Sequence, residues 1–174
     1  TERNGLFTPA VIDVDSDGTA DRVYAGDFAG NLWVFDLTSE SANDWNIIDK
    51  APLFTAGNGQ SITVQPQVVN HPSPSASDPN FLILFGTGHF FSGSDKNNPT
   101  TQTFYGIWDV GKNRMTRSNL TSQSFLLNDE EQKARVLDSD LDIGYANNIN
   151  KKYGWFIDLP SSGERVIHSA VVHG

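Results

Sequence analysis

The chain has 174 residues, 37% of them hydrophobic and 19% charged, which is the composition of a folded globular protein rather than a disordered or membrane-embedded one. Its 21 acidic and 12 basic residues give a net charge of −9, so long-range repulsion argues against nucleic acid and anionic membranes as partners and in favour of cations. The absence of cysteine excludes disulfides and thiolate metal sites, and no apolar run approaches the roughly 18 residues of a membrane span.

The start of the chain lacks the features of a complete gene product. Thr1 is not an initiator methionine, and the pattern of a signal peptide, a basic segment and then an apolar one, does not follow it. We therefore expect a segment of a larger protein. Its length suits a single domain over residues 1–174.

Short runs of β-branched and aromatic residues, separated by Gly, Asn, Asp and Pro, predict strands along most of the chain. In chain order these runs are 9–14, 22–26, 31–37, 61–69, 81–88, 103–110, 153–159 and 165–172. Residues 128–137 offer a cap and an acidic first turn but lie between strand-like segments, so a short helix and a hairpin with a polar tip both fit. The predicted fold class is all-β.

Two sequence elements recur. One occurs as PAVID (9–13), PQVVN (66–70) and SAVVH (169–173), and the other as WVFDL (33–37), GIWDV (106–110) and WFIDL (155–159). This repetition predicts β-propeller-like blades built from antiparallel meanders, in a whole propeller or a fragment of one. The irregular spacing requires insertions, and the stretches near 70–80 and 92–102 have the composition of surface loops. A β-sandwich with long loops is the alternative.

The stretch DVDSDGTAD (13–21) resembles a calcium-binding loop in its spacing. Calcium takes six to eight oxygen ligands, and alternate positions 1, 3 and 5 of such a loop, here Asp13, Asp15 and Asp17, turn their carboxylates toward one ion. Gly18 supplies the sharp turn at position 6, and Thr19 ligates through its carbonyl oxygen at position 7.

The end of this loop departs from the helix-loop-helix calcium site. Position 9 is Asp21, but position 12, where a bidentate glutamate is expected, is Tyr24. The flanking residues are strand-like rather than helical. We therefore predict a strand-loop-strand calcium site in which Asp21 completes the ligand set.

The aspartates of 13–21 have other interpretations than calcium binding, and a second acidic stretch has to be compared with them. The aspartates of 13–21 could merely form Asx-turns, although four in this register repel one another by about 1 kcal/mol per close pair in water. Magnesium prefers fewer protein ligands, and zinc prefers nitrogen or sulfur. The acidic stretch at 138–144 places Leu141 and Gly144 in the wrong positions, so we predict a solvated strand edge there rather than an ion site.

Other residue types give weaker signals. The four histidines, His71, His89, His168 and His173, lack the spacing of a metal or catalytic motif, so we expect them to be exposed or packed. The basic run Lys112, Arg114 and Arg117 predicts a solvated turn. Core packing is the expected role of the strand aromatics Trp33, Phe35, Tyr105, Trp108, Trp155 and Phe156.

Three blocks of the sequence carry a resemblance to a known family. The blocks DVDSDGTADRVYAGDFAGNLWVFDL (13–37), FGTGHFFSG (85–93) with QTFYGIWD (102–109), and YGWFIDLPSSGERV (153–166) resemble the C-terminal β-propeller domain of the PilC/PilY family. These proteins are tip-associated adhesins and assembly factors of bacterial type IV pili. The resemblance extends over residues 6–174, and the first block is the most specific.

The resemblance implies a calcium site, a location and partners. The family's calcium ligands fall on Asp13, Asp15, Asp17 and Asp21, and on the carbonyl of Thr19. Calcium occupancy in that family is tied to pilus extension and retraction. The implied location is the pilus tip at the bacterial cell surface, reached through the periplasm and outer membrane. Implied partners are pilin or other pilus-tip proteins and a host or abiotic surface. The chain is shorter than a full propeller of the family and has no RGD tripeptide.

Three functions are compatible with these features of the sequence. The favoured one is a calcium-binding module in pilus biogenesis and adhesion, which catalyses no reaction. A quinone-cofactor propeller dehydrogenase is the second, but its calcium site is assembled from separate blades, whereas the loop 13–21 is contiguous. The third is a carbohydrate-binding β-domain that uses exposed aromatic side chains.

Overall fold

The computed structural model describes residues 4–57, 59–71, 79–111, 113–129, 134–138, 143 and 151–172. Regular structure in these residues consists of strands and four single-turn 3-10 helices: η1 (Ala42–Asp44), η2 (Ile48–Lys50), η3 (Asp95–Asn97) and η4 (Arg117–Asn119). The predicted all-β class is confirmed. In the described part of the chain, no helix has the length and apolar character needed to cross a membrane.

The first sheet is built around an antiparallel meander of β1 (Ala10–Ile12), β2 (Arg22–Gly26) and β3 (Asn31–Asp36). Its strand order is β1-β2-β3-β5-β9, where β5 is Phe54–Thr55 and β9 is Met115–Thr116, and β4 (Asn46–Ile47) also pairs with β3. Strand β9 runs parallel to β5, so a segment distant in sequence completes this sheet.

The second sheet repeats the meander. Its order is β10-β13-β8-β7-β6, with β6 (Gln67–Asn70), β7 (Phe81–Gly86), β8 (Thr103–Asp109), β10 (Thr121–Gln123) and β13 (Gly154–Asp158). Strands β6, β7, β8 and β13 are antiparallel neighbours, and β10 is parallel to β13.

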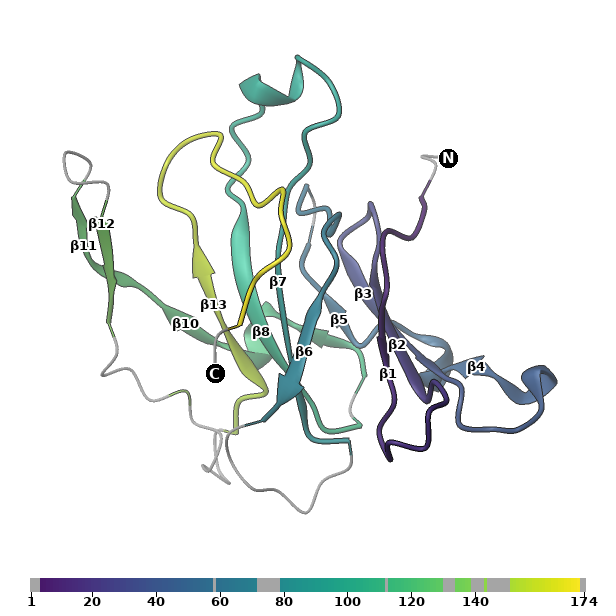
Figure 1. Ribbon diagram of the computed structural model, residues 1–174. Coiled ribbons are helices and arrows are strands. Elements are labelled where there is room, and N and C mark those ends of the chain that lie inside the picture. The colour runs from purple at the N-terminus through teal and green to yellow at the C-terminus, as the bar shows by residue number, and fades with distance from the viewer. Residues whose placement is uncertain are drawn as a thin grey trace.

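The two sheets contain two of the three predicted copies of each sequence element as the first and third strands of a meander. The third copies do not form a further meander in the described residues, because WFIDL lies in β13 of the second sheet and the described part of SAVVH forms no strand. The segments PAVID and PQVVN supply the first strands, β1 and β6, and the segments WVFDL and GIWDV end the third strands, β3 and β8. Figure 1 shows the meander β1–β3, in purple to blue, beside the second sheet, with β1 next to β6. Each sheet therefore has the meander of a propeller blade.

The core lies between the two sheets. Tyr24 and Leu32 of the first sheet are fully buried with Ile83 and Tyr105 of the second, and Phe54 bridges them, 4.9 Å from the Tyr105 ring. Alternation explains the arrangement, because successive residues of a strand face opposite sides. Tyr105, Trp108 and Phe156 are buried as predicted, whereas Trp33, Phe35 and Trp155 are half-buried on outward faces.

The ambiguous segment at 128–137 forms a hairpin, not a helix. Strand β11 (Phe125–Asp129) pairs antiparallel with β12 (Ala134–Leu137), and the tip between them lies outside the described residues. Arg135 on β12 forms a salt bridge with Glu164, which ties the hairpin to the C-terminal segment. Figure 1 shows this hairpin standing apart from the two larger sheets.

One predicted strand is wrong. Residues 165–172 form no strand in the described part of the chain, although the Val166 amide donates to the Thr87 carbonyl at 3.0 Å. Alternation and β-propensity are present there, but no strand in the described part of the chain pairs with this segment. Loop 92–102 contains η3 and joins β7 to β8, whereas residues 72–78 of the other predicted loop lie outside the described residues.

Candidate metal centre

The aspartate loop joins β1 to β2, and the sheet fixes its two ends. The Asp21 amide donates to the Ile12 carbonyl at 2.9 Å, and the Leu37 amide, just after β3, donates to the Asp21 carbonyl at 2.8 Å. Asp21 is buried, with 9% of its surface exposed, whereas Asp13 and Asp15 are exposed. The loop therefore projects from a fixed base formed by three strands.

Three of the predicted ligands come together. One carboxylate oxygen from each of Asp13, Asp15 and Asp21 lies within 4.8 Å of the other two. Oxygens on opposite sides of a calcium ion are about 4.6 to 5.2 Å apart, since each Ca–O distance is about 2.3 to 2.6 Å. The spacing and the all-oxygen donor set therefore fit a calcium ion.

Backbone amides of the loop already neutralise part of this charge. Asp13 accepts hydrogen bonds from the amides of Ser16 (2.7 Å) and Gly18 (2.9 Å), and Asp21 accepts one from Val14 at 2.6 Å. Ser16 and Gly18 both have positive φ, 64° and 93°, which turns the chain tightly around the carboxylates. The Asx-turn interpretation of the sequence thus describes real contacts, and these contacts also hold the three carboxylates together.

Asp17 and Thr19 are arranged differently from the other predicted ligands. The Oδ1 atom of Asp17 accepts hydrogen bonds from the Thr19 hydroxyl (2.6 Å) and the Thr19 amide (2.7 Å), and Asp17 is not part of the three-carboxylate cluster. These two donors lower the pKa of Asp17. Ligation by Asp17 and by the Thr19 carbonyl stays a prediction. In the second acidic stretch, residues 139–142 and 144 lie outside the described residues.

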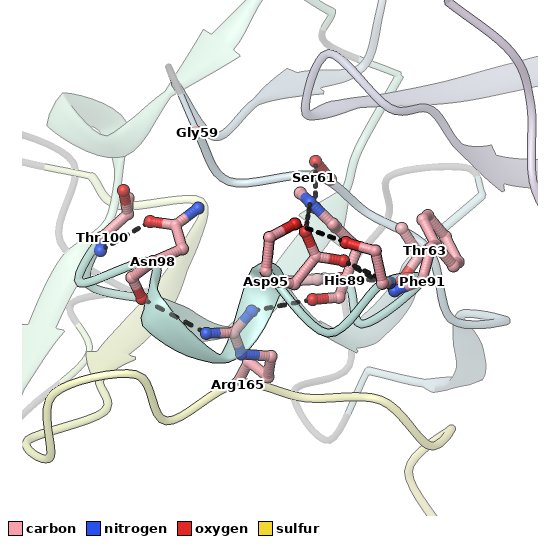
Figure 2. Close-up of polar contacts among 12 residues, drawn as sticks. Gly59, Ser61, Thr63, His89, Phe91, Asp95, Asn98, Thr100 and Arg165 are labelled. Carbon is pink, nitrogen blue, oxygen red and sulfur yellow. Dashed lines mark hydrogen bonds and ion pairs between the residues drawn. The ribbon is translucent and has the colours of Figure 1, made fainter.

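A second polar cluster, which the sequence did not reveal, lies at the β7–β8 loop (Figure 2). Ser61 Oγ is 3.2 Å from His89 Nδ1, and Asp95 Oδ1 is 3.8 Å from His89 Nε2, too far for a hydrogen bond. Asp95 also accepts the Phe91 amide at 2.8 Å, and Arg165 donates to the His89 carbonyl at 2.9 Å. Ser61 is 2% exposed and closed to a substrate, so this cluster orders the loop rather than forming a hydrolase site.

Two buried aspartates were also missed as individual residues. Asp27 accepts four hydrogen bonds, from the backbone amide and the side chain of Asn31, the Trp33 indole and the side-chain amide of Asn4. Asp109 is 1% exposed and accepts hydrogen bonds from the Tyr24 hydroxyl at 2.7 Å and from Arg22 at 3.2 Å. Because Tyr24 and Arg22 belong to β2 and Asp109 to β8, this carboxylate joins the two sheets.

The expectation for the histidines is confirmed where they are described. The His71 ring is buried and stacks on Trp108 at 4.4 Å, and His89 packs against Phe28 and Phe91, with ring centroids 4.9 and 5.5 Å away. His168 is exposed, and His173 lies outside the described residues.

The solvated-turn prediction for the basic run is wrong for Arg117. Its guanidinium binds both oxygens of Asp158, at 3.0 and 2.8 Å, and lies 3.9 Å from the centre of the Phe156 ring. The reason is that β9 pairs with β5 and β10 pairs with β13, which brings η4, the segment between β9 and β10, beside β13. Local sequence cannot reveal these distant pairings. The Arg114 amide donates to the Pro52 carbonyl, and Lys112 lies outside the described residues.

Known proteins similar to this chain are pilus biogenesis factors. The sequence profile of the PilY1 beta-propeller domain matches residues 1–140. The type IV pilus biogenesis factor PilY1 of Pseudomonas aeruginosa is 33% identical, over 92% of this chain and 17% of that protein. A PilY1 homolog of Xylella fastidiosa is also 33% identical, over 98% of this chain and 12% of that protein. The chain thus spans less than a fifth of the length of these curated relatives.

A solved structure gives the same result for the fold. The chain is similar to the crystal structure of the Pseudomonas aeruginosa PilY1 C-terminal domain, with a TM-score of 0.78 and 30% identity, over 97% of this chain and 42% of that one. The two meanders therefore belong to a propeller-like fold, and the β-sandwich alternative falls away. On its sequence and its fold, the chain belongs to the family of PilY1 beta-propeller domains.

Proposed function

We propose that this domain is a calcium-binding module of a type IV pilus biogenesis protein. The observation that carries the proposal is the approach of Asp13, Asp15 and Asp21 to within 4.8 Å in a loop whose base is fixed to β1, β2 and β3. Three carboxylates at this spacing repel one another, and a divalent cation turns that repulsion into attraction. Asp17 and the Thr19 carbonyl would complete the oxygen shell.

The names of the relatives support the biological setting of the module. Both curated relatives are named type IV pilus biogenesis factors, which supports a role in pilus assembly at the bacterial cell surface. Reaching that surface requires export through the periplasm and the outer membrane. The proposed role is non-enzymatic: calcium fixes the loop geometry that pilin, another pilus-tip protein or an external surface contacts, and its occupancy biases pilus extension or retraction.

Calcium binding would also stabilise the domain. A ligand that binds the native state at a free concentration one hundred times its Kd adds about 2.7 kcal/mol to the free energy of unfolding. This is a large fraction of the roughly 5 to 15 kcal/mol typical of a domain. The Tm should therefore fall in chelator and recover when calcium is restored.

Isothermal titration with calcium tests the proposal. The wild-type protein should bind at least one ion, and Asp21→Asn should weaken binding at least tenfold while keeping the shape of the side chain. Asp49→Asn is the matched control, since Asp49 is an exposed η2 residue outside the loop whose positive φ of 54° suits asparagine. No heat of binding, together with the same Tm in calcium and in chelator, would refute calcium binding.

A further inference from the structure

A groove runs beside the aspartate loop and is larger than an ion site requires. Its volume is about 780 Å³, within the range of about 300 to 1,000 Å³ typical of small-ligand sites and many times the roughly 30 Å³ occupied by one water. It lies between the β1–β2 loop and the segment that follows β3. Its lining residues are Val14, Asp15, Asp17, Thr19, Ala20, Asp21, Arg22, Leu37, Thr38, Ser39, Glu40, Trp45 and Pro79.

The charge on the groove wall is negative and uncompensated. Among the described residues that line the groove, four are acidic and one, Arg22, is basic. Arg22 is already 3.2 Å from the buried Asp109 carboxylate of the second sheet. A calcium ion on the loop would still leave the groove negative. It would carry two positive charges against the four aspartates of the loop 13–21, and the charge of Glu40 would be added to theirs. The wall therefore favours a cationic ligand with or without calcium.

An aromatic ring on the groove wall favours the same class of ligand. The Trp45 side chain lines the groove with 48% of its surface exposed, and its indole N–H donates to the Ser39 carbonyl at 2.9 Å. That hydrogen bond holds the ring on the segment that follows β3. An exposed indole attracts ammonium and guanidinium groups through its π face. Val14, 43% exposed, and Leu37 offer apolar surface on which the alkyl part of a lysine or arginine can pack.

We propose that this groove binds an extended segment of another protein through a lysine or arginine side chain. The positive charge would lie against Glu40 and the Trp45 ring, and the alkyl part against Val14 and Leu37. The size of the groove favours a polypeptide over a single small cation, and its charge excludes nucleic acid and anionic lipid. This inference goes beyond calcium binding and does not depend on it, because Trp45 and Glu40 are not predicted calcium ligands.

The test follows the Trp45 indole N–H by nuclear magnetic resonance while peptides are added to the whole domain. A hexapeptide of alternating glycine and lysine, blocked at both ends, should shift this resonance, and the matching glycine–glutamate peptide should not. Spermidine serves as the small-amine probe and should bind more weakly than the lysine peptide. Binding of spermidine at equal strength would overturn the polypeptide assignment.

Variants then separate the groove from general surface charge. Because Trp45→Ala removes the indole reporter, the variants are followed at the backbone amide of Val14, which lines the same groove. Trp45→Ala and Glu40→Gln should each weaken lysine-peptide binding about two- to fivefold, the effect of a cation–π contact or one exposed charge pair. Asp49→Asn removes the same charge outside the groove and should change nothing. An equal loss in Asp49→Asn, or no loss in Trp45→Ala and Glu40→Gln, would overturn the proposal.

Titrations in chelator and in saturating calcium distinguish this proposal from the calcium site. The lysine peptide should bind in both conditions and more weakly in calcium, because the ion removes part of the negative charge. Calcium binding itself is followed at the amide of Gly18. Peptide binding without a calcium response would leave the groove assignment standing and refute only the calcium site, and the reverse result would do the opposite.

Discussion

The two ends of strand β2 treat negative charge in opposite ways. At its start, in the loop 13–21, the carboxylates of Asp13, Asp15 and Asp21 gather near the surface and are only partly balanced by backbone amides. At its end, Asp27 is 1% exposed and receives four hydrogen bonds from three residues. The first arrangement is the one that the proposed calcium ion would neutralise, whereas the second is neutralised by hydrogen bonds within the protein.

This difference distinguishes the proposed ion site in the loop 13–21 from Asp27, which has a structural role. Burial raises the pKa of Asp27, but hydrogen bonds from Asn31, Trp33 and Asn4 outweigh burial, and the net pKa is lowered. A carboxylate stabilised in this way holds the N-terminal segment, the β2–β3 turn and β3 together. At the other end, Asp15 is exposed and accepts a hydrogen bond from the Asp17 amide at 3.1 Å. Removing its charge relieves repulsion within the cluster and leaves this exposed amide to water, which costs little.

The largest predicted effect is the loss of Asp27. Asp27→Ala leaves the Trp33 indole, the Asn31 amide and the Asn4 side chain without their acceptor and should lower the free energy of unfolding by about 4 kcal/mol. Asp15→Ala, measured in chelator, is the matched change at the other end of β2 and should cost less than about 0.5 kcal/mol. Urea denaturation gives both values, and similar costs at the two ends would contradict the comparison.

A second contrast concerns Gly26, the last residue of β2. A Cβ at Gly26 would overlap the side chain and carbonyl oxygen of Ile62, which is fully buried, so Gly26→Ala should cost about 3 kcal/mol through overpacking. The double variant Gly26→Ala/Ile62→Ala should cost less than the sum of the two single changes, because Ile62→Ala removes the Cγ2 atom that lies nearest to the added Cβ. Additive costs in denaturation experiments would mean that the strain comes from the Cβ and the carbonyl oxygen of residue 62, which Ile62→Ala retains.

Gly18, in the loop at the other end, should respond more weakly. A Cβ there meets nothing within 4 Å, and the cost of Gly18→Ala comes from its φ of 93° alone, about 1 kcal/mol in chelator. If calcium binds as proposed, the cost should grow in saturating calcium, since the altered turn also lowers the affinity of the loop for the ion. The free energy of unfolding, measured in both conditions, checks this; a cost as large as that of Gly26→Ala would mean that the loop is packed rather than open.

Local sequence was sufficient for the meanders and for part of the site. The alternation in 31–36 puts Leu32 and Val34 in the core. The spacing of the aspartates predicted that Asp13, Asp15 and Asp21 lie close together, as they do, while their binding of an ion stays a prediction. These features depend on residues a few positions apart, where the periodicity of two in a strand and the tightness of a turn dominate.

Features that depend on distant pairing were not predictable. Strands β5 and β9 are two residues each. They exist because β5 pairs with β3 and β9 pairs with β5. The pairing of Arg117 with Asp158 spans 41 residues, and the Asp109 bridge to Tyr24 spans 85. Conversely, residues 165–172 have a strand-like sequence but no ladder partner among the described residues. Sequence gives the propensity of a segment, while the fold decides whether a partner is present.

The smallest predicted effect concerns the pKa of one loop carboxyl, that of Asp17. The pKa of Asp17 is lowered by the Thr19 hydroxyl and then by the Thr19 amide, with burial opposing them weakly, so Thr19→Val should raise this pKa by removing the hydroxyl while keeping the amide. A carboxyl whose folded-state pKa is lowered stabilises the fold above the unfolded-state value of about 3.9 and loses that contribution as the pH falls through the folded-state pKa. Thr19→Val should therefore slightly reduce the contribution of Asp17 to the free energy of unfolding at neutral pH.

Carboxyl resonances followed by nuclear magnetic resonance from pH 6 downward, in chelator, report the pKa of Asp17, with that of Asp27 as the internal control. An unchanged pKa for Asp17 in Thr19→Val would mean that another donor holds this carboxylate, and Asp17 would then resemble Asp27 more than its neighbours in the loop.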